Sequence, residues 1–484
     1  MGLMIRSLVG MFSLLFIGWA ISLDRRHIPW RVIIGGTLLQ LLFAFIVLKT
    51  TVGKWFFFAI NGVIVGLLGF AKRGAAFIFG NLVNNNVPVG VPYGGTSNVM
   101  SPLQPDTIST MANVGSMFAF SVLPTIIFFS AFMAVLYHLG VMQKIVKGFS
   151  WVMEKTLRTS GAETLSASAN IFVGQTEAPL IVRPYLAKMT RSELFCIMTG
   201  GFATVAGGVM AAYVGFLLDK FPTIAGHLMA ASVMSAPSAL VFAKLICPED
   251  DSPATAGGAN ADIPKIDANV IDAASRGTTE GMQLAINVGA MLISFIALIA
   301  LGDKILGLIA LPLGKIIPFF SEMAIAPSPL KFIFGYCLAP LAWLMGVRSE
   351  DVRMVGELMA TKTVVNEFVA YLDLSSMIGK LSPRSAIIAI YALCGFSNFS
   401  SIGIQIGGIS ALCPERRGDL ARIGLRAMIA GTLACFMTAT IAGAIQSEKS
   451  ALIQNRVVYE KTVTTSIVTD TSSASTVLTP QDVK

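Results

Sequence analysis

The run Asn170-Ile171-Phe172-Val173-Gly174-Gln175-Thr176-Glu177-Ala178-Pro179 decides how this 484-residue chain folds. It places amide, hydroxyl and carboxylate groups between apolar stretches that are each too short to span a bilayer. Gly174 and Pro179 disfavour a continuous helix, and irregular backbone at membrane depth is tolerated only where it lines a cavity in the protein. The run therefore predicts a re-entrant hairpin over residues 164–190, whose tip presents Gln175, Thr176 and Glu177 to a ligand.

The next apolar segment is weakened at its centre. The stretch from Thr199 to Gly208 holds glycines at positions 200, 201, 207 and 208, and glycine destabilises the interior of a helix. A break there would expose backbone carbonyls and amides in the middle of a span. Glycines also allow helices to pack closely, so this segment alone leaves both interpretations open.

The second half of the chain repeats the pattern and favours the break. A carboxylate stands in Val365-Asn366-Glu367-Phe368-Val369-Ala370-Tyr371, and a glycine-interrupted segment follows from Cys394 to Gly408. The carboxylate precedes the broken segment by a similar distance in each half, from 177 to 204 and from 367 to 398. Interrupted hydrophobic segments at corresponding places of two halves indicate the central site of a transporter. A charge inside the membrane costs at least about 3 kcal/mol, so Glu177 and Glu367 are expected to face a cavity.

Composition places the whole chain in a membrane. Hydrophobic residues make up 54% and charged residues 13%, against about 25% charged in soluble domains, and the mean hydropathy is +0.73. Apolar stretches that approach the roughly 20 residues needed for a span occur at 8–23, 32–50, 117–141, 192–218, 224–246, 281–301 and 423–445, with further runs at 328–347 and 384–413. We predict an all-α polytopic membrane protein with about eight transmembrane helices, two re-entrant hairpins and two broken helices in an inverted-repeat arrangement.

Basic loops orient the chain. Three arginines between residues 25 and 31 follow the first apolar run, and short loops rich in Lys and Arg stay on the cytoplasmic side, so the amino terminus is expected outside. Later basic clusters at 144–158, 183–191 and 416–426 fall on the same side if 55–80 lies at the interface and 164–190 is re-entrant. Topology thus explains the net charge of +8, and no nucleic-acid partner is expected because no basic-aromatic platform is present.

Taken together, these motifs resemble the concentrative nucleoside transporters. The resemblance rests on 170–179, 200–208, 366–371 and 392–401, followed by Cys413-Pro414-Glu415-Arg416-Arg417-Gly418-Asp419, and it extends over residues 5–445. It implies a bacterial-type sodium/nucleoside cotransporter in a plasma membrane, the inner membrane in a bacterium. It also implies a homotrimer in which each protomer has a scaffold part and a mobile transport part.

The resemblance implies a division of the chain and a set of site residues. The parts are 1–141 (scaffold helices and an interfacial helix), 142–246 (first repeat), 247–279 (cytoplasmic loop), 280–327 (scaffold helix), 328–445 (second repeat and last helix) and 446–484 (a polar, disordered tail). The base-binding residues are Gln175, Thr176, Glu177 and Val209, and the ribose-binding residues are Glu367, Phe396, Asn398 and Ser401. The sodium ligands are the side chains of Asn170 and Thr204 and the backbone carbonyls of Val173 and Val205.

The chemistry of these residues suits those roles. A nucleoside is uncharged, so its site needs hydrogen-bond partners: the Gln175 amide can donate and accept, and the Glu367 carboxylate can accept from two ribose hydroxyls. Sodium prefers hard oxygen ligands, which a carboxamide, a hydroxyl and free carbonyls supply. Thr204 stands where a serine is common in the family, and its added methyl group leaves proton coupling as the alternative.

We therefore expect a symporter that imports nucleosides with a sodium gradient by alternating access, with sodium as the co-transported ion and no organic cofactor. A channel is a further alternative, since polar groups at the middle of a bilayer can also form a filter. An enzyme is not expected, because no nucleophile, metal cluster or nucleotide-binding motif accompanies Glu177 and Glu367. The six cysteines and three histidines are scattered and indicate no metal site.

Overall fold

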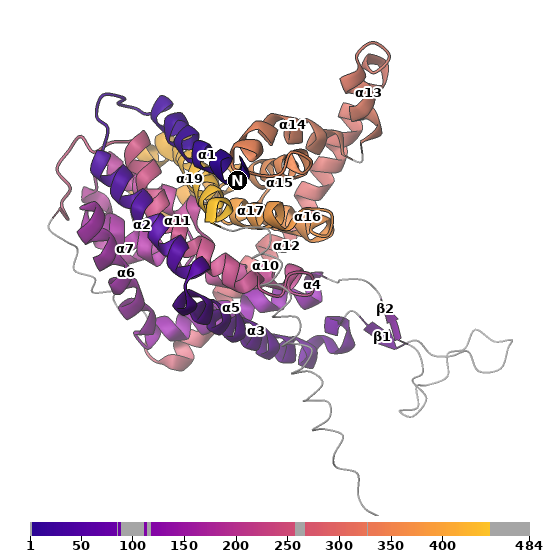
Figure 1. Ribbon diagram of the computed structural model, residues 1–484. Helices are drawn as coiled ribbons and strands as arrows, with labels where there is room; N and C mark the ends of the chain where they lie inside the picture. Colours follow the sequence, from indigo (N-terminus) through magenta and orange to yellow (C-terminus); the bar gives the residue numbers. More distant parts are fainter. Residues whose placement is uncertain are drawn as a thin grey trace, which may run out of the picture.

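The computed structural model describes residues 2–84, 86–88, 111–113, 118–256, 267–326 and 328–445, and the described residues are overwhelmingly helical (Figure 1). The first elements in chain order are α1 (Gly2–Ala20), α2 (Trp30–Lys49), α3 (Thr51–Phe79), the 3-10 helix η1 (Gly80–Asn84), β1 (Asn86–Pro88), β2 (Met111–Asn113), α4 (Phe118–Ser121), α5 (Leu123–His138) and α6 (Val141–Leu157). The strands pair antiparallel. The predicted all-α class is confirmed, with this small two-stranded sheet added between η1 and α4.

The first repeat has a hairpin followed by a broken helix. Its elements are α7 (Gly161–Ala169), α8 (Ala178–Ile181), the 3-10 helix η3 (Arg183–Lys188), α9 (Arg191–Ala203), α10 (Gly207–Leu217) and α11 (Ile224–Ile246). Residues 170–177 form the turn of the hairpin, and 204–206 separate α9 from α10. At a rise of about 1.5 Å per residue, α7 is about 14 Å long, well short of the roughly 30 Å core of a bilayer.

The second repeat shows the same order. The elements after α11 are α12 (Val270–Leu313), α13 (Pro318–Ile325), α14 (Pro329–Leu344), α15 (Val352–Val364), α16 (Glu367–Met377), α17 (Pro383–Leu393), α18 (Phe399–Leu412), the 3-10 helix η4 (Pro414–Arg416) and α19 (Arg417–Ile445). Two residues, 365–366, separate α15 from α16, and 394–398 separate α17 from α18. Both broken helices predicted from the glycine patterns are therefore present. That the two hairpins re-enter a membrane remains a prediction.

The two repeats exchange contacts reciprocally. The second part of each broken helix packs on the second helix of the other repeat's hairpin: α10 on α16, and α18 on α8. Two repeats related by a pseudo-two-fold axis give this pattern. The breaks also lie against each other, because a Cβ at Gly395 would stand 2.8 Å from the carbonyl oxygen of Phe202 and 2.9 Å from that of Ala203. With φ at +140° as well, Gly395 allows an approach that a larger residue would prevent.

Burial separates an inner core from an outer layer. In the described part of the chain, eight helical segments are long and apolar enough to cross a membrane, counting α9 with α10 and α4 with α5 as one segment each. In the most apolar 18-residue stretch of the α9–α10 segment, 94% of the residues are buried, and the same share is buried in α11. In the corresponding stretch of α12 only 17% of the residues are buried. α12 is 44 residues long and carries α13 at its far end, projecting from the rest (Figure 1). Its apolar exposed side chains suit a hydrocarbon environment or another chain, as a polytopic membrane protein requires.

Three features refine the sequence-based picture. α3 is one of the eight helices that could span, so its expected position at the interface remains a prediction. α12 begins at Val270, inside the segment expected to be a cytoplasmic loop over 247–279, because Asn269 accepts hydrogen bonds from the first backbone amides of the helix. The tail at 446–484 lies outside the described residues.

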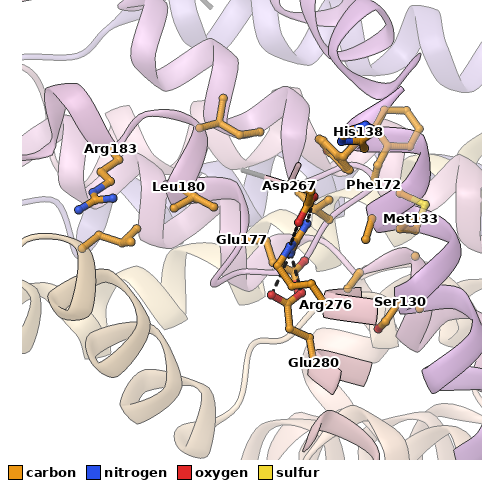
Figure 2. Close-up of a pocket in the computed structure, with 18 of the residues that line it drawn as sticks. Ser130, Met133, His138, Phe172, Glu177, Leu180, Arg183, Asp267, Arg276 and Glu280 are labelled. Carbon is orange, nitrogen blue, oxygen red and sulfur yellow. Dashed lines mark hydrogen bonds and ion pairs between the residues drawn. The ribbon is translucent and has the colours of Figure 1, made fainter. Parts of the chain in front are cut away.

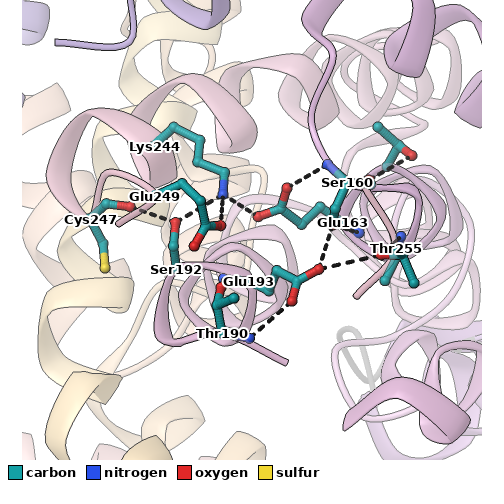
Figure 3. Close-up of polar contacts among 11 residues, drawn as sticks. Ser160, Glu163, Thr190, Ser192, Glu193, Lys244, Cys247, Glu249 and Thr255 are labelled. Carbon is teal, nitrogen blue, oxygen red and sulfur yellow. Dashed lines mark hydrogen bonds and ion pairs between the residues drawn. The ribbon is translucent and has the colours of Figure 1, made fainter. Parts of the chain in front are cut away.

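A buried polar cluster joins the starts of α7 and α9 to the end of α11 (Figure 3). Lys244, in the last turn of α11, forms ion pairs with Glu163 of α7 (Nζ to Oε1, 2.5 Å) and with Glu249 (2.8 Å). Glu193 of α9 accepts from the Ser160 hydroxyl at 2.7 Å. Glu163 and Glu193 each complete a capping box at the start of their helix. α7 and α9 therefore begin side by side. α7 leads to the hairpin turn at 170–177, and α9 leads to the helix break at 204–206.

Candidate functional site

A continuous chain of hydrogen bonds joins buried polar side chains of both repeats. The Tyr213 hydroxyl donates to Glu367 Oε1 (3.1 Å), and Asn398 Nδ2 donates to Glu367 Oε2 (2.8 Å). Asn398 Oδ1 accepts from the backbone amide of Ser401 (2.8 Å), and Gln175 Nε2 donates to the Ser401 hydroxyl (3.3 Å). The predicted base-side and ribose-side residues thus meet at Ser401.

Helix caps position the ribose-side residues. Asn366 is the N-cap of α16 and accepts from Val369 N at 3.0 Å, which makes Glu367 the first residue of that helix. Asn398 caps α18 in the same way. A carboxylate at a helix N-terminus is favoured by the helix dipole, which lowers the cost of burying the Glu367 charge. Tyr213 is held by stacking on Tyr371, with ring centroids 4.3 Å apart.

The predicted cation ligands lie at the hairpin turn and the first helix break. Asn170 is 1% exposed, and among the described residues neither atom of its side-chain amide has a hydrogen-bond partner. A Cβ at Gly200 would stand 3.1 Å from Asn170 Nδ2, and the Thr204 hydroxyl donates to the Gly200 carbonyl at 2.9 Å. Asn170 and Thr204 therefore both contact Gly200. A buried amide without a partner costs about 1–3 kcal/mol, which an oxygen-seeking cation on Oδ1 would offset.

One backbone hydrogen bond ties the same two segments together. Gly207 N donates to the carbonyl of Phe172 at 2.9 Å, which joins the start of α10 to the hairpin turn. Val173 and Val205 are adjacent to the bonded segments, and within the described part of the chain no hydrogen bond reaches either of their carbonyl oxygens. The residues present thus fit a sodium ion.

A cavity of about 770 Å³ opens beside the hairpin turn (Figure 2). Val173, Glu177 and Val209 line it, together with residues of α5 and α12. Glu177 accepts from its own turn, at Gly174 N (2.6 Å). The volume lies within the roughly 300–1,000 Å³ of ligand pockets in proteins.

An ion-pair group that lines the same cavity lies beside Glu177 (Figure 2). Arg276 donates to Asp267 Oδ1 from Nε at 2.6 Å and to Glu280 Oε1 from Nη1 at 2.9 Å. The Arg276 guanidinium holds the pKa of Asp267, which lies just before α12, below its ordinary value. Two carboxylates share one guanidinium, so this wall of the cavity is polar and carries an excess of negative charge.

The predicted site residues fall into three places. Gln175, Glu367, Asn398 and Ser401 belong to the hydrogen-bonded chain. Thr176 packs on α18, where a Cβ at Gly408 would lie 2.6 Å from its methyl group, and Phe396 is buried in the second helix break. Glu177 and Val209 stand apart from the chain and line the cavity.

Three buried residues near this chain were missed by the sequence analysis. Gln405 donates to Gln175 Oε1 at 3.1 Å, and Lys362, fully buried in α15, donates to the Ala392 carbonyl at 2.9 Å. The isolated amide in Gly403-Ile404-Gln405-Ile406-Gly407 was a usable signal, since a lone polar group in an apolar run needs a buried partner. Tyr213 gave no such signal, because its partner lies 154 residues away.

Family models match most of the chain. The model described as the N-terminus of Na⁺-dependent nucleoside transporters matches residues 9–82, and the one for their C-terminus matches residues 227–443. A gate model described as nucleoside recognition matches residues 119–220 between them.

Relatives and solved structures agree with these matches. A Bacillus subtilis protein described as the uncharacterized transporter YutK is 42% identical over 437 residues, covering 90% of this chain and 98% of its own length. Sodium/nucleoside cotransporter 1 of Rattus norvegicus is 36% identical, covering 95% of this chain and 66% of its own. The structure of CNTnw in an inward-facing substrate-bound state has a TM-score of 0.78 and 39% identity, covering 91% of this chain and 97% of its own.

Proposed function

The chain belongs to the Na⁺-dependent nucleoside transporter family, whose members are multi-pass membrane proteins and not enzymes, and from this premise we propose that it is a sodium-coupled nucleoside symporter. It imports nucleosides across a plasma membrane by alternating access, and sodium is the co-transported ion. By analogy with the family, three copies assemble into a trimer.

The hydrogen-bonded chain through Ser401 is the observation that carries this proposal. It links an amide of one repeat, Gln175, to a carboxylate of the other, Glu367, through Ser401 and Asn398, and both groups are buried. Glu367 accepts from two ribose hydroxyls, in part replacing its present donors. Gln175 and Thr176 contact the base, and Glu177 and Val209 close the cavity side of the site. A neutral ligand with a polar ribose and a flat base suits this arrangement.

Sodium couples to the nucleoside through the hairpin turn. Asn170 and Val173 belong to the turn, and Thr204 and Val205 belong to the helix break, so one ion bound between them fixes the turn against α9. Gln175 follows Val173 by two residues and is therefore ordered at the same time. Sodium then lowers the cost of ordering the base-side residues, and each ligand promotes binding of the other.

Uptake of radiolabelled uridine into proteoliposomes tests this function. An inward sodium gradient should accumulate uridine above the external concentration, and a sodium ionophore should abolish the accumulation. A pH gradient imposed without sodium should not drive uptake; if it drives uptake equally well, the proton-coupled alternative is correct. Equilibration without accumulation under either gradient would indicate a channel.

A further inference from the structure

Gln405 occupies a fully buried position between the two repeats. Its Nε2 donates to the backbone carbonyl of Met198 in α9 at 3.1 Å and to Gln175 Oε1 at 3.1 Å. Gly201 provides the space for this contact, because a Cβ there would lie 2.7 Å from Gln405 Nε2 and 2.9 Å from Gln175 Cβ. Both glutamine side chains are therefore packed against the same point of α9.

The carbonyl of Met198 fixes the orientation of both amides in turn. A backbone carbonyl only accepts, so the group of Gln405 that faces it must be the NH₂ group. The same NH₂ group faces Gln175, which must then present its oxygen. The NH₂ group of Gln175 is left pointing to Ser401, whose hydroxyl accepts one N–H at 3.3 Å. One N–H of Gln175 remains for a ligand.

We propose that Gln405 is a specificity-determining residue that acts through Gln175: it holds the Gln175 amide so that the base of a nucleoside meets a donor and not an acceptor. The proposal rests on the proposed function, in which Gln175 contacts the base. If Gln175 turned over, its NH₂ group would face the NH₂ group of Gln405 and one buried hydrogen bond would be lost. A base that offers a donor at this position is therefore disfavoured.

Uridine and cytidine provide the direct probe, because they exchange donor and acceptor groups at positions 3 and 4 of the base. A fixed amide distinguishes the two nucleosides whichever of these positions it faces, while an amide free to turn accepts both. We expect half-saturating concentrations for uptake that differ about fivefold in the wild type, the factor for one net buried hydrogen bond.

Gln405→Met keeps the length of the side chain and removes the amide. It should bring the uridine-to-cytidine ratio to within about twofold of one, because Gln175 can then present either end. Gln40→Met is the matched control, since Gln40 is also a buried glutamine but donates to Thr438 at 2.8 Å, outside the hydrogen-bonded chain of the site. The control should keep the wild-type ratio.

Two results would overturn this role of Gln405: a wild-type ratio near one, or a wild-type ratio that persists unchanged in Gln405→Met. Thermal unfolding of both variants establishes that they are folded. Failure of the proposed function is distinguishable, because the wild type would then accumulate neither nucleoside under a sodium gradient.

Discussion

At the scale of single residues, the Glu367 carboxylate is the most constrained group in the site. It is 3% exposed, and its two oxygens accept from a phenol and an amide that come from different repeats. A buried carboxylate needs such donors, because an unsatisfied charged group costs several kcal/mol. The same donors fix the orientation of the carboxylate, which is the proposed acceptor for the ribose hydroxyls.

Glu367→Gln should abolish uridine uptake and leave the protein folded. An amide accepts through one oxygen only, and its NH₂ group would face one of the two donors that now point at the carboxylate. The measurement is sodium-driven uridine uptake, with thermal unfolding as the check on folding. Competition by 2′,3′-dideoxyuridine should be weak in the wild type; competition equal to that of uridine would contradict recognition of the ribose by Glu367.

Tyr213→Phe should raise the half-saturating uridine concentration about tenfold or more. The variant keeps the ring and its stacking but removes one hydrogen bond to a charged acceptor, which is worth about 1.5–3 kcal/mol. Tyr371→Phe is the control, because the Tyr371 hydroxyl donates to the Ile390 carbonyl at 2.8 Å and not to Glu367. Equal effects of the two substitutions would mean that Tyr213 acts only through packing.

At the scale of helices, two adjacent glycines of α9 lie against the proposed ion site and the proposed substrate site. Gly200 faces Asn170, and Gly201 faces Gln175 and Gln405. Gly200→Ala should therefore raise the sodium concentration for half-maximal uptake, and Gly201→Ala should raise the half-saturating uridine concentration at saturating sodium. Each alanine gains helix propensity of up to about 1 kcal/mol, while the close contacts at Gly201 cost packing energy, so thermal unfolding of both variants is the check on folding. Identical effects on both curves would contradict the separation.

The buried cluster at the start of α7 and α9 should dominate the stability of this end of the molecule. Lys244→Ala leaves Glu163 and Glu249 without their shared cation, a change that costs about 3–5 kcal/mol for a buried pair. It should lower the thermal midpoint by at least about 5 °C. Lys144→Ala on the exposed face of α6 should not shift it. A Lys244→Ala midpoint equal to that of the wild type would show that these carboxylates need no cation.

Helices and breaks were predictable because their causes are local. Gly174, Pro179 and the glycines at 200–208 lower helix stability in place, and the structure interrupts its helices near them. Which site residues line the cavity and which belong to the hydrogen-bonded chain was less predictable. The turn that places Glu177 at the cavity, apart from Gln175, and the contacts of Tyr213 and Gln405 depend on packing between repeats more than 150 residues apart. Contacts between residues so far apart in the chain cannot be inferred from one sequence without the fold.

At the scale of the whole molecule, a proposed sodium ligand and a proposed base-binding residue lie on one structural unit, the hairpin turn. The hairpin turn carries Asn170, at the proposed cation site, and Gln175, in the hydrogen-bonded chain that reaches Glu367. A ligand that fixes the turn against α9 and α18 therefore favours binding of the second ligand: sodium favours the nucleoside, and the nucleoside favours sodium. This is a coupling free energy between two sites, which must be equal in both directions.

The dependence of uridine binding on sodium tests the account most directly. Purified protein is titrated with uridine at a series of sodium concentrations, with choline keeping the ionic strength constant, and the sodium dependence is repeated with Thr204→Val. The account predicts that sodium strengthens uridine binding by roughly 5- to 150-fold, and that uridine strengthens sodium binding by the same factor. Thr204→Val removes one ligand oxygen, so it should shift the sodium dependence without changing uridine affinity at saturating sodium. Uridine affinity that is the same in sodium and in choline, or a sodium dependence unshifted in Thr204→Val, would contradict it.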